Sequence, residues 1–244
     1  MTILKNLIYL GRQTKVTSLL IIINIVWFAI SRLSYPLSFV DSLNGIFFIR
    51  WGADVSQLTF SGQYWRMFTC LFMHVSITHL AMNMLALFSV GNILERQIPW
   101  FAFLGIYILS GIISSLTSDI ATINNNVISC GASGAILGII SALLAYSLVN
   151  RESLKEMPVR AIIVSLILTA GLGLLPSINN MAHLGGALAG FILGALISLL
   201  IKWFYFSTKL TSFLISIVFI ATTGCIYLVY EHFKLPEIIQ QIYN

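Results

Sequence analysis

Charged residues are scarce in this chain, and their scarcity excludes a water-soluble globular protein. Only 9% of the 244 residues are charged and 58% are hydrophobic, with a mean hydropathy of +0.95, whereas soluble domains average roughly 25% charged residues. Runs of basic residues are also missing, because the 13 Lys and Arg residues fall singly between apolar blocks. The net charge of +5 therefore forms no face that follows phosphates, and we expect no nucleic-acid partner.

Cysteine is sparse as well. Cys70, Cys130 and Cys225 are far apart and lack CxxC or Cys/His metal spacing, which excludes a disulfide framework and a zinc site. We interpret them as buried core thiols. HExxH is absent, and His74 and His79 are five apart with no glutamate after them, so we expect no metal and no cofactor.

Long apolar runs, by contrast, make up most of the chain. A membrane-spanning helix needs about 20 mainly apolar residues, and seven segments qualify. Each has the length of a helix rather than of a barrel strand, so we predict an all-α integral membrane protein. The first run has no small-residue cleavage site after it and is interpreted as a retained span. The predicted spans are 16–31, 78–94, 100–118, 133–149, 160–175, 182–201 and 211–230.

The placement of basic residues predicts the orientation of these spans. With the N-terminus inside, nine of the Lys and Arg residues lie at cytoplasmic ends and loops and four lie outside, as the positive-inside rule requires. We therefore expect a multi-pass protein of the bacterial inner (cell) membrane, with its N-terminus inside and its C-terminus outside. The second, fourth and sixth spans then begin on the outer side.

Two outer connections are informative. The first, 34–77, is too long for a turn and rich in aromatic residues, so we expect a structured element lying in the membrane interface. The second, 119–131, contains three asparagines that are costly in hydrocarbon. The helix near Ser133 is therefore predicted to begin close to the outer surface.

Strongly polar residues within the spans are candidates for function, because lipid penalises them. His79 and Asn83 are four apart and so share one helix face. Ser133 begins the fourth span within Gly-Ala-Ser-Gly, and His183 begins the sixth within Ala-His-Leu-Gly-Gly. Because these three spans run in the same direction, we expect the four residues to converge at one depth.

These residue types suit nucleophilic catalysis. A serine becomes a nucleophile when a base such as neutral histidine takes its proton, and Ser133 and His183 supply that pair. His79, the Asn83 amide and the backbone N–H of Ser133 at a helix start can stabilise an oxyanion. The alternative is a polar hydrogen bond between helices, with no chemistry.

No carboxylate is expected beside this pair. Asp41, Asp54 and Asp119 fall in predicted outer loops, and Glu95 lies at the cytoplasmic end of the second span. The expected arrangement is a dyad rather than a triad.

Small residues are spaced for close helix packing. Gly134 and Gly138 form one small-xxx-small face, and Gly186, Gly190 and Gly194 form another. Taken alone these glycines indicate packing only. Close packing of the fourth and sixth spans is nevertheless what would bring Ser133 to His183.

Short motifs surround the four polar residues in a fixed order. They are Tyr64-Trp65-Arg66, Phe68-Thr69, Phe72-Met73-His74, His79-Leu80, Asn83, Gly91, Glu95-Arg96, Gly131-Ala132-Ser133-Gly134, Asn179 and Ala182-His183-Leu184-Gly185-Gly186. In this order, and on these spans, the chain resembles a rhomboid intramembrane serine protease. The resemblance covers about residues 16–202.

The resemblance implies roles for particular residues. Ser133 would be the nucleophile and His183 the general base, with His79, Asn83, Gly131 and the Ser133 amide at the oxyanion hole. The expected reaction is cleavage of single-span membrane proteins near the outer end of their helix. Transmembrane protein substrates and the lipid bilayer are the expected partners.

The resemblance also divides the chain. A short cytoplasmic N-terminus (1–15) would precede a rhomboid-like six-helix core (16–202) that contains the interfacial first outer loop (34–77). A seventh helix and a short outer tail (203–244) would complete a six-plus-one arrangement.

Further implied roles are structural. Trp65 and Arg66 would shape the first loop, while His74 and Glu95 would be hydrogen-bonding residues. One position departs from the pattern: Leu137 stands where many relatives carry an aromatic residue against the catalytic histidine.

Other readings of the sequence remain. A proteolytically inactive rhomboid-like protein that binds transmembrane clients would share the fold, although inactive relatives typically lack the serine or the histidine. A small transporter should show paired broken helices or charged midplane residues, and neither appears in the sequence. An aspartyl intramembrane protease would need a pair of intramembrane aspartates, which the predicted spans lack.

Overall fold

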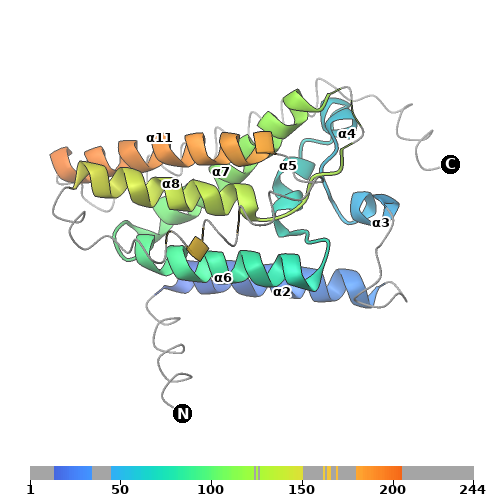
Figure 1. Cartoon of the computed structure of the whole chain (residues 1–244), viewed down its shortest axis with the longest axis horizontal. Coiled ribbons are helices and arrows are strands. Elements are labelled where there is room, and N and C mark those ends of the chain that lie inside the picture. The colour runs from blue at the N-terminus through green and yellow to red at the C-terminus, as the bar shows by residue number, and fades with distance from the viewer. Residues whose placement is uncertain are drawn as a thin grey trace, which may run out of the picture.

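The fold is an all-helical bundle, as the apolar runs predict. The computed structural model describes residues 14–34, 45–123, 125, 127–150, 162, 164–165, 169 and 180–204. Across these ranges the regular elements are helices, and extended chain pairs only in an isolated bridge between Asp54 and Ser129. The bundle (Figure 1) consists of the long helices α2 (Lys15–Leu33), α6 (Ile77–Leu94), α7 (Trp100–Ala121), α8 (Ser133–Val149) and α11 (Asn180–Phe204).

These helices coincide with five of the predicted spans and identify an integral membrane protein. Four are long and apolar enough to cross a membrane, and α8 is apolar but shorter. Of the other predicted spans, 160–175 lies mostly and 211–230 entirely outside the described residues, as do Asp41, Asn179 and Cys225. The six-plus-one arrangement and the division of the chain therefore stay predictions.

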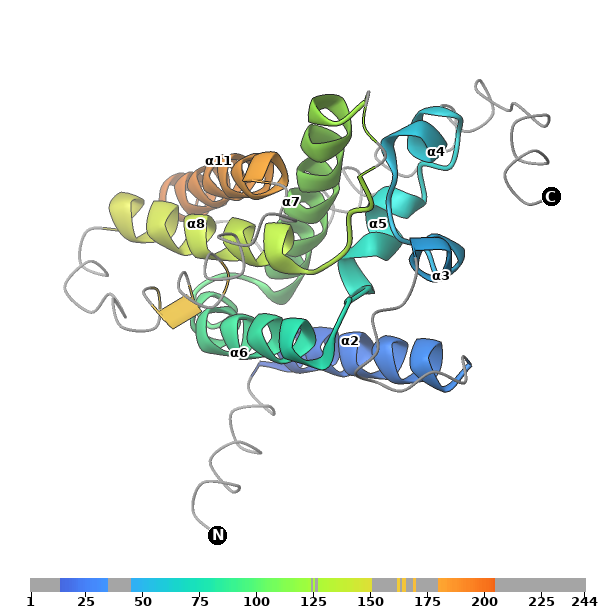
Figure 2. The same cartoon turned by 45° about the vertical axis from the view of Figure 1, so that its right-hand side comes forward.

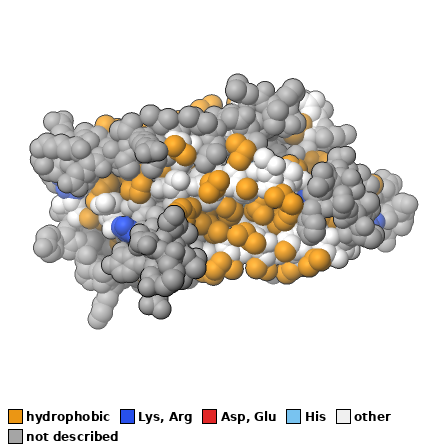
Figure 3. Space-filling view, turned by 60° about the horizontal axis from the view of Figure 1, so that its bottom comes forward, with side chains coloured by type: hydrophobic (Ala, Val, Ile, Leu, Met, Phe, Trp, Pro, Cys, Tyr) orange, Lys and Arg blue, Asp and Glu red, His pale blue; other side chains and the backbone are white. Residues whose placement is uncertain are grey.

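One face of the bundle is hydrophobic. Figure 3 looks onto the side formed by α2 and α6 and shows hydrophobic side chains across its middle, flanked by the visible Lys and Arg side chains. An apolar surface of this kind suits contact with lipid rather than water. On α2 the large exposed hydrophobic residues are Leu19, Ile22, Ile23, Ile25, Val26, Ile30 and Leu33.

The connection predicted to be the first outer loop is structured over residues 45–72, as its length and composition predict. It folds into the short helices α3 (Gly45–Arg50), α4 (Ser56–Phe60) and α5 (Arg66–Thr69) and the 3-10 turn η1 (Cys70–Phe72). These elements lie together at one end of the bundle (Figure 2). Figure 1 shows that α6, α8 and α11 all begin at this same end.

A buried arginine holds this connection together. Arg66 is 1% exposed. Its Nη1 donates to the carbonyl oxygens of Ile49 (2.6 Å) and Ala53 (2.9 Å), and its Nε donates to Gln63 (2.7 Å). Its guanidinium also lies 4.4 Å from the centre of the Trp65 ring, so backbone carbonyl groups, an amide and an aromatic ring surround the cation. These contacts are the ones through which Trp65 and Arg66 would shape the loop, as the resemblance implies.

The start of α2 is fixed by a carboxylate from the end of α6. Glu95 accepts hydrogen bonds from the backbone N–H groups of Val16 (2.9 Å) and Thr17 (2.8 Å) and from the Thr17 hydroxyl (2.7 Å). The first N–H groups of a helix have no intrahelical acceptor, and negative charge suits that end. Glu95 thus caps α2.

The other end of α2 is fixed by its own arginine. Arg32 is buried and donates through Nη2 to the carbonyl oxygens of His74 (3.1 Å) and Val75 (2.7 Å). Its guanidinium lies 4.9 Å from the ring centre of Phe28 and 5.2 Å from that of Phe47. Arg32 therefore joins α2 to α3 and to the residues that precede α6.

Glycines let α8 and α11 pack so closely that their backbones are in direct contact. A Cβ built on Gly186 would overlap the backbone of Gly134, and one on Gly190 would overlap that of Gly138. Such contacts need residues without side chains. The packing sets the first turn of α11 beside the first turn of α8.

Candidate active site

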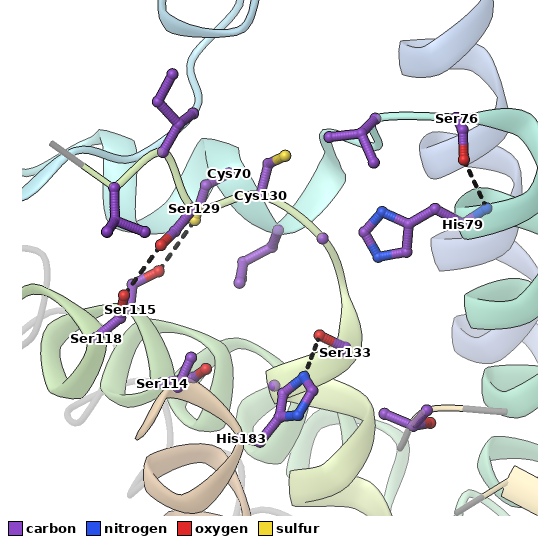
Figure 4. Close-up of a pocket in the computed structure, with 18 residues that line it drawn as sticks. Cys70, Ser76, His79, Ser114, Ser115, Ser118, Ser129, Cys130, Ser133 and His183 are labelled. Atoms are coloured by element: carbon purple, nitrogen blue, oxygen red, sulfur yellow. Dashed lines mark hydrogen bonds between the residues drawn. The ribbon is translucent and has the colours of Figure 1, made fainter. Parts of the chain in front are cut away.

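Two of the predicted residues meet where α8 and α11 begin. Ser133 is the first residue of α8, and His183 lies in the first turn of α11. The Oγ of Ser133 and the Nε2 of His183 are 2.9 Å apart, within hydrogen-bond distance (Figure 4). Within the described part of the chain, the His183 ring is hydrogen-bonded to Ser133 and is not in contact with a carboxylate. Among these residues, the arrangement therefore consists of a serine and a histidine without an acidic third member.

The pair opens into a cavity lined by both polar and apolar side chains. Its volume is about 290 Å³, which exceeds by far the roughly 15 Å³ that one water molecule needs. His79 and Gly131 line it together with the pair. A wall of hydroxyl groups faces them, from Ser114, Ser115, Ser118 and Ser129.

The serine wall was not predicted from the sequence. Ser110, Ser114 and Ser118 are spaced four apart on α7 and are buried. A Cβ on Gly134 would overlap Ser114, and one on Gly138 would overlap Ser110. This spacing is the same small-xxx-small signal that the glycines gave, and it would have identified α7 as the third helix of the close contact.

Gly131 shapes the part of the cavity wall next to His79. Its φ of +131° is a backbone conformation that favours glycine. Its N–H donates to the carbonyl oxygen of Cys70 (2.9 Å). A Cβ here would lie 2.8 Å from Cε1 and 3.0 Å from Nε2 of His79, so the His79 ring occupies the space that a side chain would fill.

His79 is held from two directions. Its backbone N–H donates to the Oγ of Ser76, the N-cap of α6, at 3.1 Å. Its ring packs edge-on against His74, with ring centres 5.0 Å apart at 65°. Neither ring nitrogen of His74 has a hydrogen-bond partner of ordinary geometry. Burial, and secondly His79, keeps the pKa of His74 well below its usual value, so the His74 ring is neutral where it packs against His79.

Asn83 lies one turn further along α6 and does not line the cavity. Its side chain is buried, and its Nδ2 donates to the carbonyl oxygen of His79 at 3.0 Å. Among the residues that the structure describes, its Oδ1 has no hydrogen-bond partner. The structure thus brings His79, Gly131, Ser133 and His183 together and leaves the Asn83 amide turned to the helix backbone.

Two placements differ from those predicted. Asp119 was expected in an outer loop, but it lies in the last turn of α7 and is 1% exposed, because α7 runs three residues past the predicted span. Cys130 was expected to be buried in the core; it packs against the core cluster of Phe47, Phe48, Ala53 and Met73, but it is only half-buried and also lines the cavity. Cys70 is 2% exposed and does belong to the core.

Comparisons with known proteins agree with this architecture. A profile described as the rhomboid domain matches residues 61–200, more than half of the chain. "RHOMBOID-like protein 5" of Arabidopsis thaliana is 33% identical over 161 residues, which cover 65% of this chain and 52% of the relative. "Rhomboid protease GluP" of Bacillus subtilis (strain 168) is 39% identical over 152 residues, covering 62% and 29%.

A third relative is also named a protease. "Rhomboid protease AarA" of Providencia stuartii is 36% identical over 174 residues, covering 62% of this chain and 60% of the relative. The chain therefore spans between 29% and 60% of the length of these three relatives.

Proposed function

The chain belongs to the rhomboid family, and from this premise we propose that it is an intramembrane serine endopeptidase with Ser133 and His183 as its catalytic dyad. The observation that carries the proposal is the 2.9 Å contact between the Oγ of Ser133 and the Nε2 of His183 in a cavity with serine hydroxyl groups on its wall, inside an apolar bundle. The printed names of two relatives, rhomboid protease GluP and rhomboid protease AarA, support it.

The first step is attack by Ser133. Neutral His183 accepts the Oγ proton of Ser133 at Nε2 while the Oγ forms a bond to the scissile carbonyl carbon. His183 then gives this proton to the leaving amine, and an acyl-enzyme remains. Water from the cavity attacks the ester, again with His183 as base, and frees Ser133. General-base catalysis of this kind contributes about 10²- to 10⁴-fold.

The tetrahedral intermediates need donors for their oxyanion. The backbone N–H of Ser133 is suited to this role because the first N–H groups of a helix have no intrahelical acceptor. His79 supplies a second donor, and Gly131 leaves room for its ring. Asn83 joins them by turning its amide from the His79 carbonyl into the cavity.

The substrate in this proposal is a protein with one transmembrane helix, cut near the outer end of that helix. The N-in, C-out orientation in the bacterial inner membrane puts the first turns of α8 and α11 on the outer side. A peptide bond inside a helix has its carbonyl group hydrogen-bonded, so glycine near the cleavage site favours cleavage by loosening the helix.

Cleavage of a reporter tests the dyad. The reporter carries one transmembrane helix and an Ala-containing, Gly-rich outer segment, and it is expressed with the wild type, Ser133→Ala or His183→Ala at equal membrane levels. Ser141→Ala is the matched control, because Ser141 lies two turns further along the same helix and outside the cavity. We expect the wild type and Ser141→Ala to cut and the dyad variants not to. Cleavage by Ser133→Ala would disprove the assignment.

A serine-reactive fluorophosphonate probe separates the alternatives if the wild type does not cut. Labelling at Ser133 would mean that the reporter is the wrong substrate. No labelling would favour the proteolytically inactive protein that binds transmembrane clients.

A further inference from the structure

A pair of buried carboxyl groups lies beside the cavity and has no role in the dyad. Asp54 follows α3, and Asp119 belongs to the last turn of α7. They are 0% and 1% exposed, and their carboxyl groups are within hydrogen-bonding reach of each other. Two carboxyl groups form a hydrogen bond only if one of them is protonated.

The remaining partners do not account for both groups. The Oδ1 of Asp54 accepts a hydrogen bond from the Thr59 hydroxyl. Within the described residues, the buried Oδ2 of Asp54 and the buried Oδ2 of Asp119 have no hydrogen-bond partner of ordinary distance and angle, although the Ser115 hydroxyl and the Val55 N–H lie near Asp54. A proton held between the carboxyl groups would remove this deficit, since an unsatisfied buried acceptor is costly.

Nearby charges do not replace the proton. α4 presents the Thr59 hydroxyl and α7 that of Ser115, both neutral. From α5, Arg66 lowers the pKa of Asp54 by its charge, but burial outweighs it and raises that pKa overall. From η1 comes the Cys70 thiol, whose pKa burial and Asp54 raise, so it stays neutral.

The pair is attached to the segment that leads into the active site. Asp54 and Ser129 exchange two backbone hydrogen bonds, of 2.9 and 2.8 Å. The Ser129 hydroxyl in turn lies 3.0 Å from that of Ser118, the neighbour of Asp119 (Figure 4). Four residues after Ser129 the chain reaches Ser133, passing through Gly131.

We propose that Asp54 and Asp119 share one proton and that this shared proton holds the segment Val127–Ala132, and with it Gly131 and Ser133, in its reactive position. The two aspartates are positioning residues. For its activity readout the inference rests on the proposed protease function. If the proton is lost at high pH, both buried carboxyl groups are negatively charged and repel each other. This repulsion moves Asp54, and the Ser129 backbone that is hydrogen-bonded to it, away from Asp119 on α7.

The sign of the pH dependence follows from proton binding. The folded pair keeps a proton that the unfolded carboxyl groups lose above their ordinary pKa of about 4. Stability therefore falls as pH rises, until the folded pair also loses its proton. The labelling rate of Ser133 should fall over the upper part of that range.

Asparagine at one of the two positions tests the inference. Asn has the shape of a protonated Asp and donates a hydrogen bond, but it does not titrate. Full-length wild type, Asp54→Asn, Asp119→Asn and the double variant are compared in detergent between about pH 6 and about pH 10. The measurements are the fluorophosphonate labelling rate of Ser133 and the midpoint of thermal unfolding. Tyr64→Phe is the control, because it removes a different ionisable group of the same connection, whose pKa burial raises, so it should stay protonated over this range.

We expect either single Asn variant to label within about twofold of the wild type at neutral pH and to shift the alkaline fall upward by about one pH unit or more. The unfolding midpoint should lose its dependence on pH in parallel, while Tyr64→Phe behaves as the wild type does. Identical pH profiles in wild type and Asn variants would overturn the proposal. So would loss of folding at every pH in both single variants, which would mean that two charged carboxylates are required.

Thermal unfolding needs no turnover. A protein that neither cuts nor labels still reports the carboxyl pair through its unfolding midpoint, so failure of this inference and failure of the proposed function are distinguishable.

Discussion

Gly190 on α11 lies so close to Gly138 on α8 that a β-carbon on Gly190 would overlap the Gly138 backbone. The contact is about two turns from His183 along α11 and between one and two turns from Ser133 along α8. The distance between the two helices at this point therefore determines whether the Oγ of Ser133 and the Nε2 of His183 stay 2.9 Å apart.

Gly190→Ala should consequently loosen both the fold and the dyad. Because backbone atoms cannot yield to the new methyl group, we expect a loss of about 1–3 kcal/mol of stability and slower fluorophosphonate labelling of Ser133. Thermal unfolding in detergent and labelling rates measure the two effects. Gly105→Ala on α7 is the control, since nothing lies within 4 Å of its Cβ, and it should be neutral or gain up to about 1 kcal/mol. Equal behaviour of the two variants would contradict this account of the packing.

Gly131→Ala should reduce reactivity more than stability. The methyl group would meet the His79 ring and would also sit on a backbone with φ of +131°. Displacing one oxyanion donor costs about 10²- to 10³-fold in rate, so we expect a labelling rate at least tenfold lower.

A second glycine of the same kind isolates the backbone effect. Gly52 also has a positive φ (+98°), but its Cβ would meet Thr69 rather than His79. Gly52→Ala should lower the unfolding midpoint and leave the labelling of folded protein near that of the wild type. A comparable loss of reactivity in both variants would rule out the His79 contact as the cause.

Glu95→Gln should destabilise the start of α2. The carboxylate accepts hydrogen bonds from two backbone N–H groups and the Thr17 hydroxyl, whereas an amide has one acceptor and would turn N–H groups toward donors. A loss of about 1–3 kcal/mol is expected, measured by thermal unfolding. Arg96→Gln removes the neighbouring exposed charge at the same end of α6 and should change little. If Arg96→Gln is as damaging, general electrostatics and not the cap is responsible.

Alkylation of Cys130 should block the cavity. The alkylation should be slow at neutral pH and become faster as the pH rises. Burial raises the pKa of this thiol to about 12, so the reactive thiolate fraction rises about tenfold per pH unit below that value. The measurement is loss of fluorophosphonate labelling after treatment with a small alkylating agent between about pH 7 and about pH 9. Cys130→Ala should abolish the inhibition. Persistent inhibition in Cys130→Ala would point to another cysteine.

The helices were predictable because apolar runs end where polar residues begin. α8 occupies Ser133–Val149 as predicted, and α6 begins one residue before the predicted span and ends with it at Leu94. The approach of Ser133 and His183 followed from parallel spans and the glycine spacing on α8 and α11.

Other features depend on partners far away in the sequence. Hydropathy ends the third span before Asp119, but the carboxyl of Asp54, 65 residues earlier, lets α7 continue into its last buried turn. The burial habit of free cysteine does not reveal that Cys130 lies on a cavity wall. The direction of the Asn83 amide is decided by a local backbone acceptor, the His79 carbonyl, which residue spacing leaves open.

Glu95 and Arg32 anchor α2 at opposite ends, one through its first N–H groups and the other through carbonyl oxygens of His74 and Val75. Because α2 is hydrogen-bonded near both of its ends, the helix can move away from the bundle only if both sets of hydrogen bonds break. In the proposed reaction we therefore expect α2 to keep its position and a substrate helix to enter from another side of the bundle.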